Sequence, residues 1–263
     1  MMMQGLGKLR SAVAGAGVAA VAAAGVCSPA QAADWSVTEI QFEYGKLKSP
    51  FAGGDSMTPI VTLQHASGWK FGDVFFFVDF INDGDVDGFN DKDAYGEFYA
   101  NFSSAKIFGI NYGNGLLKDL GFMASMDFDA DAGYFAWIIG GYADWNVPGF
   151  AFLRTYVAGV IDQSDIAQDD GWQADIAWAY PFTIGGQRFS FEGHAEYTGN
   201  SANIYGKQLD WILAQPQFRW DIGYALGGDK DRFFVGTEYQ YWQNKLGTNV
   251  DESAFQALAV WRF

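Results

Sequence analysis

Cysteine is almost absent from this sequence of 263 residues, and the single one, Cys27, lies close to the amino terminus. The residues around it are typical of a secretory signal peptide, because Lys8 and Arg10 precede a stretch of small apolar residues and an Ala-Gln-Ala sequence follows. We therefore assign residues 1–32 to a cleaved signal peptide and residues 33–263 to a single mature domain. The mature chain then has no cysteine, which excludes disulfides, thiolate nucleophiles and cysteine-based metal sites.

Basic residues are also scarce, with 16 Lys and Arg against 31 Asp and Glu, so the net charge is −15. Cleavage of the signal peptide changes this to −17, because Lys8 and Arg10 leave and no acidic residue does. Such acidity argues against nucleic acid and other phosphate-rich ligands. The mature chain also lacks an apolar run long enough for a membrane helix.

The prediction of the fold starts from the last stretch of the chain. Alternate residues there form an apolar stripe, namely Phe255, Ala257, Ala259, Trp261 and Phe263. This pattern is typical of a strand whose outer face meets lipid. Because unpaired backbone groups are not tolerated in hydrocarbon, the other strands must close a barrel with it. We expect the terminal Phe263 to be recognised by the barrel-assembly machinery.

Alternating segments of about ten residues, the length that a tilted membrane strand needs, recur along the chain. The predicted strands are residues 35–44, 57–66, 71–81, 94–104, 120–128, 133–145, 150–160, 171–182, 188–197, 209–222, 232–242 and 253–263. The expected fold is therefore an all-β, transmembrane antiparallel β-barrel of about twelve strands in the outer membrane of a Gram-negative bacterium. An even number of strands places both termini on one side, which we expect to be periplasmic.

Short connections at residues 145–149, 183–187 and 226–230 are expected to be periplasmic turns, whereas longer polar ones are expected to be extracellular loops. One connection fits poorly. Residues 105–118 are long for a periplasmic turn, so we expect a short helix or a misplaced strand end there.

The predicted strands separate into an apolar face and a polar face, and the polar face predicts a wet lumen. In the ninth strand the polar side chains are Arg188, Ser190, Glu192, His194 and Glu196. In the first strand they are Glu39, Gln41 and Glu43. We expect some lumen carboxylates to pair with Arg154, Arg188 and Arg219.

The third predicted strand departs from this rule. If its even-numbered residues face lipid, Asp73, Phe75, Phe77 and Asp79 all face the lumen, so two aromatic rings share a face with two carboxylates. Exposed rings beside a channel could stack on a base or another ring, an interaction of about 1 to 3 kcal/mol per base in nucleic-acid sites. Alternatively, the rings pack against an inward loop or plug, and alternation alone favours neither interpretation.

Three short stretches carry a resemblance to a known family. They are Gln64–Trp69, Gly72–Phe80 and Tyr95–Glu97, which read QHASGW, GDVFFFVDF and YGE. The chain resembles the nucleoside-specific channel-forming outer-membrane proteins, the Tsx-like family. This resemblance implies a twelve-stranded barrel with a narrow lumen that binds nucleosides weakly as they pass, with Phe75, Phe77, Asp79 and Glu97 as lining residues.

The chemistry of the lumen face agrees with nucleosides. Aromatic faces can take the base, carboxylates and amides such as Asp175, Gln215 and Gln217 can bond ribose hydroxyls, and an acidic lumen repels phosphate. The candidate substrate-binding residues are Phe75, Phe77, Asp73, Asp79, Glu97, Glu39, Glu43, Glu192, Glu196 and Arg219.

No cofactor and no metal ion are expected. The acidic segment at residues 83–88 matches only the first half of an EF-hand loop, because Ala94 stands where a bidentate Glu belongs. A solvated loop is the prediction, with a loose surface Ca²⁺ site as the alternative.

Two other functions are weighed against the nucleoside channel. One is a general cation-preferring porin, in which the acidic residues select charge and the rings fill space. The other is an outer-membrane phospholipase-type hydrolase built on His65 and Ser67. The sequence positions no third residue to orient His65, so we do not expect an enzyme.

Overall fold

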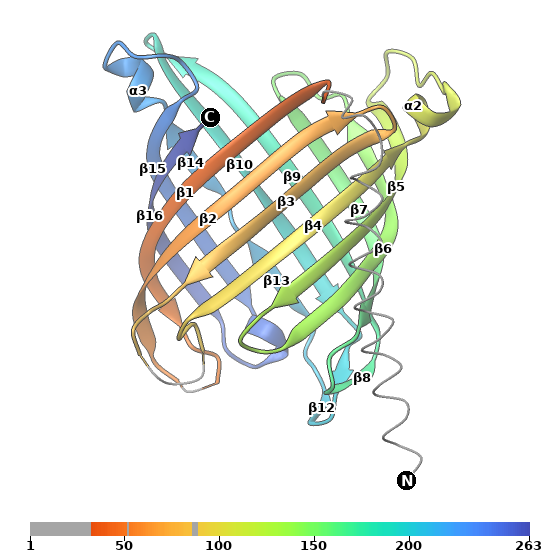
Figure 1. Ribbon diagram of the computed structural model, residues 1–263, viewed down its shortest axis with the longest axis vertical. Helices are drawn as coiled ribbons and strands as arrows, with labels where there is room; N and C mark the ends of the chain where they lie inside the picture. The colour runs from red at the N-terminus through yellow and green to blue at the C-terminus, as the bar shows by residue number, and fades with distance from the viewer. Residues whose placement is uncertain (1–32, 52, 86–88) are drawn as a thin grey trace. The chain divides into compact units, whose positions relative to one another are not determined.

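Twelve strand positions, each antiparallel to its neighbours, close into a barrel (Figure 1). The computed structural model describes residues 33–51, 53–85 and 89–263, so the predicted signal peptide at residues 1–32 lies outside the described residues. In the first half of the barrel the strands are β1 (Trp35–Lys48), β2 (Asp55–Trp69), β3 (Gly72–Ile81), β4 (Asp93–Ser103), β5 (Leu117–Asp129) and β6 (Tyr134–Trp145).

The second half completes the sheet and returns it to its start. Its strands are β7 (Phe152–Asp162), β9 (Gly171–Ile184), β10 (Gln187–Gly199), β13 (Trp211–Ala214) with β14 (Gln217–Trp220), β15 (Phe233–Gln243) and β16 (Glu252–Arg262). The last strand pairs with the first, with Glu39 opposite Arg262 and Gly45 opposite Gln256. The predicted fold class and the number of strand positions are therefore confirmed.

Both ends of this barrel unit, Trp35 and Phe263, lie at the same end, since the Phe263 amide donates to the Thr38 carbonyl oxygen. We call this end the terminal end and the opposite one the loop end. The predicted periplasmic location of the terminal end remains a prediction.

Two connections at the terminal end contain short helices. Residues 105–118 do contain a short helix, α2 (Ser104–Phe108). The connection predicted as a short turn at residues 226–230 is longer than expected, because β14 ends at Trp220 and residues 221–232 carry a second short helix, α3 (Ile222–Ala225). The helix begins where the Asp221 carboxylate caps the Tyr224 amide, which ends the strand early.

The connections at the loop end are more elaborate. Strands β8 (Ala167–Asp169), β11 (Ala202–Asn203) and β12 (Gly206–Lys207) form a separate small sheet there, opposite α2 and α3 in Figure 1. The predicted loop at residues 46–56 is shorter than expected, because β1 and β2 stay paired as far as Lys48 and Asp55.

The outer face of the barrel is apolar and exposed. On β16, Phe255 is 70% exposed and Trp261 is 50% exposed, whereas the inward-facing Gln256 and Val260 are 1% and 0% exposed. Ile40, Phe42 and other large apolar side chains continue this surface on the neighbouring strands. Within the described residues, no helix is both long and apolar enough to cross a membrane.

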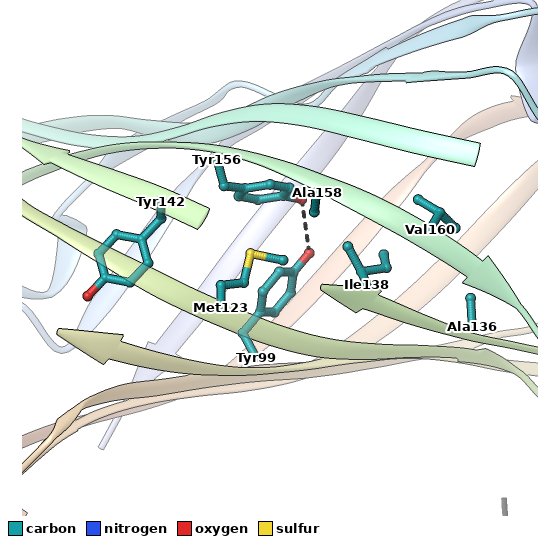
Figure 2. Packing of buried hydrophobic residues seen from close by; sticks show 8 residues of the cluster. All are labelled: Tyr99, Met123, Ala136, Ile138, Tyr142, Tyr156, Ala158 and Val160. Atoms are coloured by element: carbon teal, nitrogen blue, oxygen red, sulfur yellow. Dashed lines mark hydrogen bonds between the residues drawn. The ribbon is translucent and has the colours of Figure 1, made fainter. Parts of the chain in front are cut away.

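A buried apolar cluster fills one side of the barrel interior (Figure 2). The cluster consists of Tyr99, Met123, Ala136, Ile138, Tyr142, Tyr156, Ala158 and Val160, with Phe75 and Tyr134 packed against it. These residues alternate along β4 to β7 with side chains that face outward. This side of the lumen is therefore a packed wall rather than a hydrated one.

A buried lysine fixes the seam between β1 and β16 at the loop end. Lys245, in η1 (Lys245–Gly247), has a side chain only 1% exposed, and its Nζ lies 3.0 Å from the Glu252 carboxylate and 2.8 Å from the Lys48 carbonyl oxygen. Burial lowers the pKa of Lys245, and the Glu252 carboxylate opposes that effect. The ion pair thus joins the last loop to both strands of the seam.

Candidate functional site

The lumen has an aromatic wall formed by β3 and β4. Phe75 and Phe77 face inward as the alternation predicts, with their ring centroids 6.1 Å apart. Each ring also contacts a tyrosine of β4, since the Phe75–Tyr99 and Phe77–Tyr95 centroid distances are both 5.9 Å. Neither phenylalanine is fully buried, so part of each ring still faces the lumen. The four rings form a continuous surface held by its own side-to-side contacts.

A carboxylate lies within the aromatic wall. Glu97 accepts hydrogen bonds from the Tyr95 and Tyr99 hydroxyls, each at 2.5 Å. The Tyr99 hydroxyl also lies 3.3 Å from that of Tyr156, as Figure 2 shows. Glu97, at 7% exposure, is thus presented to the lumen by two phenols rather than by a basic residue.

Amides dominate the wall formed by β1, β14, β15 and β16. The Gln217 amide donates to Glu238 at 2.8 Å and to Gln41 at 3.2 Å, and Glu43 lies 3.4 Å from the same amide nitrogen. Glu238 also accepts from Gln256 at 2.9 Å. These donors and acceptors fix one another in position and face inward.

Arg219 lies within this polar wall and pairs with two of the predicted lumen carboxylates. Its Nη1 is 3.1 Å from Glu39 and 3.3 Å from Glu192. Glu39 is shared with Arg262, whose Nη2 lies 2.5 Å away. The side chains of Arg219 and Glu39 are 3% and 2% exposed, so this chain of charges is buried. The expected pairing of Arg219 with lumen carboxylates is confirmed.

A second ion-pair cluster lies beside the aromatic wall. Asp73 receives two hydrogen bonds from Arg154, at 2.8 and 2.9 Å, and a third from Asn101 at 2.8 Å. Arg154 also bonds Asp144 and stacks over the Tyr142 ring at 4.2 Å from its centroid. Asp73 therefore has its hydrogen bonds and its charge satisfied by the protein.

The remaining lumen carboxylates form what we call the carboxylate girdle, linked by mutual electrostatic interactions across the barrel. Its members are Glu43, Asp79, Glu97, Asp127, Asp175, Glu196 and Glu238. Among the described residues, His194 and Arg219 are the positive partners that interact with it most strongly. Carboxyl groups therefore outnumber basic side chains on this part of the lumen wall.

Neutral polar side chains donate hydrogen bonds to several carboxylates of the girdle. The Thr62 hydroxyl donates to Asp79 at 2.5 Å, and the Gln173 amide donates to Glu196 at 2.5 Å. Glu192, just outside the girdle, accepts from the Ser190 hydroxyl at 2.5 Å.

The two residues of the hydrolase interpretation lie away from the lumen. His65 is on the outward face of β2, where its Nδ1 lies 2.7 Å from the Thr38 hydroxyl and its ring stacks on Phe76 with the centroids 5.4 Å apart. Ser67 follows two residues later on the same face. The neighbours of His65 are a hydroxyl and a ring rather than a carboxylate, so the arrangement lacks the orienting acid of a hydrolase triad.

The structure brings all ten predicted site residues to the lumen side of the barrel, but into different surroundings. Phe75, Phe77 and Glu97 share the aromatic wall, whereas Glu39, Glu192 and Arg219 form a buried charge network elsewhere. Sequence reasoning did not assign Tyr95 and Tyr99 to the site. Their spacing of two residues on either side of Glu97 in one strand places all three side chains on one face and could have identified them.

Comparison with known proteins supports the fold. No protein-family model and no curated protein sequence matches the chain. Among solved structures, it resembles the KdgM porin with a TM-score of 0.50 and 7% identity, over 86% of this chain and 99% of that one. It resembles the NanC porin with a TM-score of 0.52 and 10% identity, over 85% and 98% respectively.

These two structures show that the chain has the fold of outer-membrane porins. A closed barrel whose outer face is apolar can satisfy its backbone in lipid, and it is the architecture of proteins that cross the outer membrane. The chain is therefore an outer-membrane β-barrel, and the predicted location is confirmed.

Proposed function

We propose that the barrel is a passive channel for small uncharged or cationic solutes with a flat ring, and that nucleosides are the natural class. The observation that carries the proposal is the placement of Phe75 and Phe77, with two tyrosines beside them, opposite a wall of amides and carboxylates inside one lumen.

The two walls suit the two parts of a nucleoside. A base can stack on the accessible faces of Phe75 and Phe77, which is worth about 1 to 3 kcal/mol per base. Carboxylate and amide groups such as Glu97 and Gln217 can accept and donate hydrogen bonds to ribose hydroxyls. Conduction requires sites that release what they bind, so weak stacking suits a channel better than a tight pocket.

The excess of carboxyl groups supports a preference for nucleosides over nucleotides. A phosphate group entering the lumen would meet the carboxylate girdle, whose described positive partners are few. Repulsion in a narrow, partly desolvated passage exceeds that in bulk water, so phosphate should be excluded.

The test is single-channel current through the purified barrel in a planar bilayer, with adenosine, thymidine and the matching nucleotides added in turn. We expect concentration-dependent block by the nucleosides and not by the nucleotides. Phe75→Ala combined with Phe77→Ala should abolish the block, while ion conductance stays the same or rises.

The matched control is Phe76→Ala combined with Phe80→Ala on the same strand. These side chains point outward, and Phe80 is 54% exposed, so the control removes two rings without changing the lumen. Block that survives in the Phe75/Phe77 variant would contradict the stacking proposal.

The carboxylate girdle also favours a second candidate, a general cation-preferring porin in which Phe75 and Phe77 only fill space. The same recordings separate the two. A porin of this kind would pass cations with a conductance that is indifferent to every nucleoside.

The proposed partners other than solutes are outer-membrane lipid and the barrel-assembly machinery. The last strand supports both proposals, because its outward face is apolar and Phe263 is 61% exposed at the end of the chain.

A further inference from the structure

We propose that Asp175, His194 and Glu196 form a binding site for a divalent transition-metal ion of the Zn²⁺ class on the lumen wall. The proposal concerns binding in the lumen and does not depend on whether nucleosides pass through it. It departs from the expectation, drawn from the sequence, that no metal is bound.

The three side chains converge because of strand register. Asp175 on β9 pairs directly with Glu196 on β10, and His194 lies two residues before Glu196, so all three point into the lumen. One ligand atom from each lies within 4.8 Å of the other two. Small side-chain rotations would bring them to the distances of about 2.0 to 2.2 Å that Zn²⁺ requires from nitrogen and oxygen.

The Gln215 side chain sets the tautomer of His194. The Gln215 side-chain oxygen lies 2.9 Å from His194 Nε2, and the Gln215 amide nitrogen donates to Gln240 at 3.0 Å. The amide orientation is thus fixed by its other partner, so Nε2 carries a proton and donates to Gln215. Orienting bonds of this kind are typical of histidines that bind metals through the other nitrogen.

The opposite nitrogen is then directed at negative charge. His194 Nδ1 lies 3.2 Å from Asp175, whose side chain is only 3% exposed. A lone pair on Nδ1 facing a carboxylate is repulsive, so a cation must lie between them, and that cation is either a proton or a metal ion. The His194 side chain is 29% exposed, which gives an ion access from the lumen.

An independent observation comes from Gln173, which is 4% exposed and lies against Glu196. Its amide nitrogen bonds Glu196, but its side-chain oxygen is buried and has no hydrogen-bond partner. A half-turn of the amide would direct this oxygen at the Glu196 carboxylate, which is favourable only if a cation lies between them. With a metal ion at this position, Gln173 can therefore supply a fourth ligand through its side-chain oxygen.

The surroundings favour a doubly charged ion. Glu97, across the lumen on β4, interacts electrostatically with both His194 and Asp175, and Glu196 interacts with Glu97. One imidazole among several carboxylates leaves the site negative. An imidazole nitrogen with carboxylate and amide oxygens suits Zn²⁺ and related ions, whereas Mg²⁺ prefers oxygen and water ligands alone.

The test is isothermal titration calorimetry of ZnCl₂ into the folded, detergent-solubilised barrel. We expect saturable binding of one Zn²⁺ per chain that an equal concentration of Mg²⁺ does not remove. His194→Ala should weaken binding at least tenfold, and Gln173→Leu, which removes the proposed fourth ligand, should also weaken it.

The control compares the same change, Asp to Asn, at two positions in the lumen. Asp175→Asn removes a proposed ligand, whereas Asp127→Asn removes the same charge from a girdle carboxylate that lies outside the site. Folding of each variant is checked by its heat-dependent mobility on gels, and Glu196→Gln replaces Asp175→Asn if that variant does not fold.

Stronger weakening by Asp175→Asn than by Asp127→Asn would support the site. Equal weakening by the two would show diffuse attraction and overturn the proposal. So would absence of saturable Zn²⁺ binding, which would leave His194 and Asp175 as a simple ion pair. Because calorimetry needs no conduction, a failure here is distinguishable from a failure of the nucleoside proposal.

Discussion

Arg219 illustrates how a single residue in this lumen can matter for stability rather than for solute binding. Its guanidinium is buried between Glu39 and Glu192, and its Nε donates to Gln217 at 2.7 Å. Removing one partner of a buried ion pair leaves charge without compensation, which costs about 3 to 5 kcal/mol. We therefore expect Arg219→Leu to lower the free energy of unfolding by that amount, measured by urea titration in lipid vesicles.

The control for this prediction is Lys46→Leu. The Lys46–Asp55 pair has side chains 58% and 45% exposed, and exposed pairs contribute about 0 to 1 kcal/mol. If the two variants unfolded at the same urea concentration, the charge network around Arg219 would not be a stabilising feature.

At the residue scale, the sequence predicted which side chains face inward but not which ones meet. Alternation placed Asp73 and Arg154 in the lumen, yet they lie 81 positions apart and on strands that are not neighbours. Their contact depends on the width and stagger of the closed barrel, which no local pattern encodes. Asp175 and His194, by contrast, lie on neighbouring strands, and their proximity depends on the residue-by-residue register of β9 and β10, which the predicted strand boundaries did not define.

The strand position occupied by β13 and β14 shows how one element is shaped for this lumen. The sequence predicted an unbroken strand over residues 209–222, but it is interrupted at Gln215 and Pro216. Proline lacks the amide that a central strand needs, so Pro216 could have indicated the break. The register with β10 is the same on both sides of the interruption, so Gln215 lies opposite His194 and its side-chain oxygen is 2.9 Å from the His194 ring nitrogen.

Gly193 makes room for this interruption. Its φ is +144°, and a Cβ added there would lie 2.3 Å from the Gln215 carbonyl oxygen and 2.9 Å from the Pro216 Cα. Strained backbone of this kind costs about 1 to 3 kcal/mol. We expect Gly193→Ala to destabilise the barrel by at least that much and to lower the folded fraction seen by heat-dependent gel mobility.

A glycine two strands away, Gly159 on β7, provides the comparison. An added Cβ there would face outward and meet nothing closer than the Ile139 carbonyl oxygen at 4.0 Å. Gly159→Ala should therefore fold as well as the natural protein. A Gly193→Ala barrel that folded equally well would show that the strand interruption opposite Gly193 tolerates a side chain.

At the scale of the whole molecule, strand number and antiparallel closure followed from the sequence because each strand carries its own alternating pattern. The division of the lumen into an apolar side and a polar side did not follow from the sequence. The apolar cluster on β4 to β7 and the polar wall on β1, β14, β15 and β16 come from separate parts of the chain, and only closure sets them opposite each other.

This division predicts the ion selectivity of the open barrel. The carboxyl groups of the girdle outnumber their described positive partners. We therefore expect the reversal potential across a KCl gradient to have the sign of a cation-selective channel. The preference for cations should weaken as the salt concentration rises, because the Debye length falls from about 10 Å at 0.1 M to about 3 Å at 1 M.

Neutralising two girdle members, with Glu97→Gln and Glu238→Gln, should shift the reversal potential toward zero. Neutralising Asp169 and Asp170, which belong to or adjoin the small sheet at the loop end, should shift it less. Anion preference in the natural protein, or equal shifts from the two pairs, would mean that the girdle does not control the passage of ions.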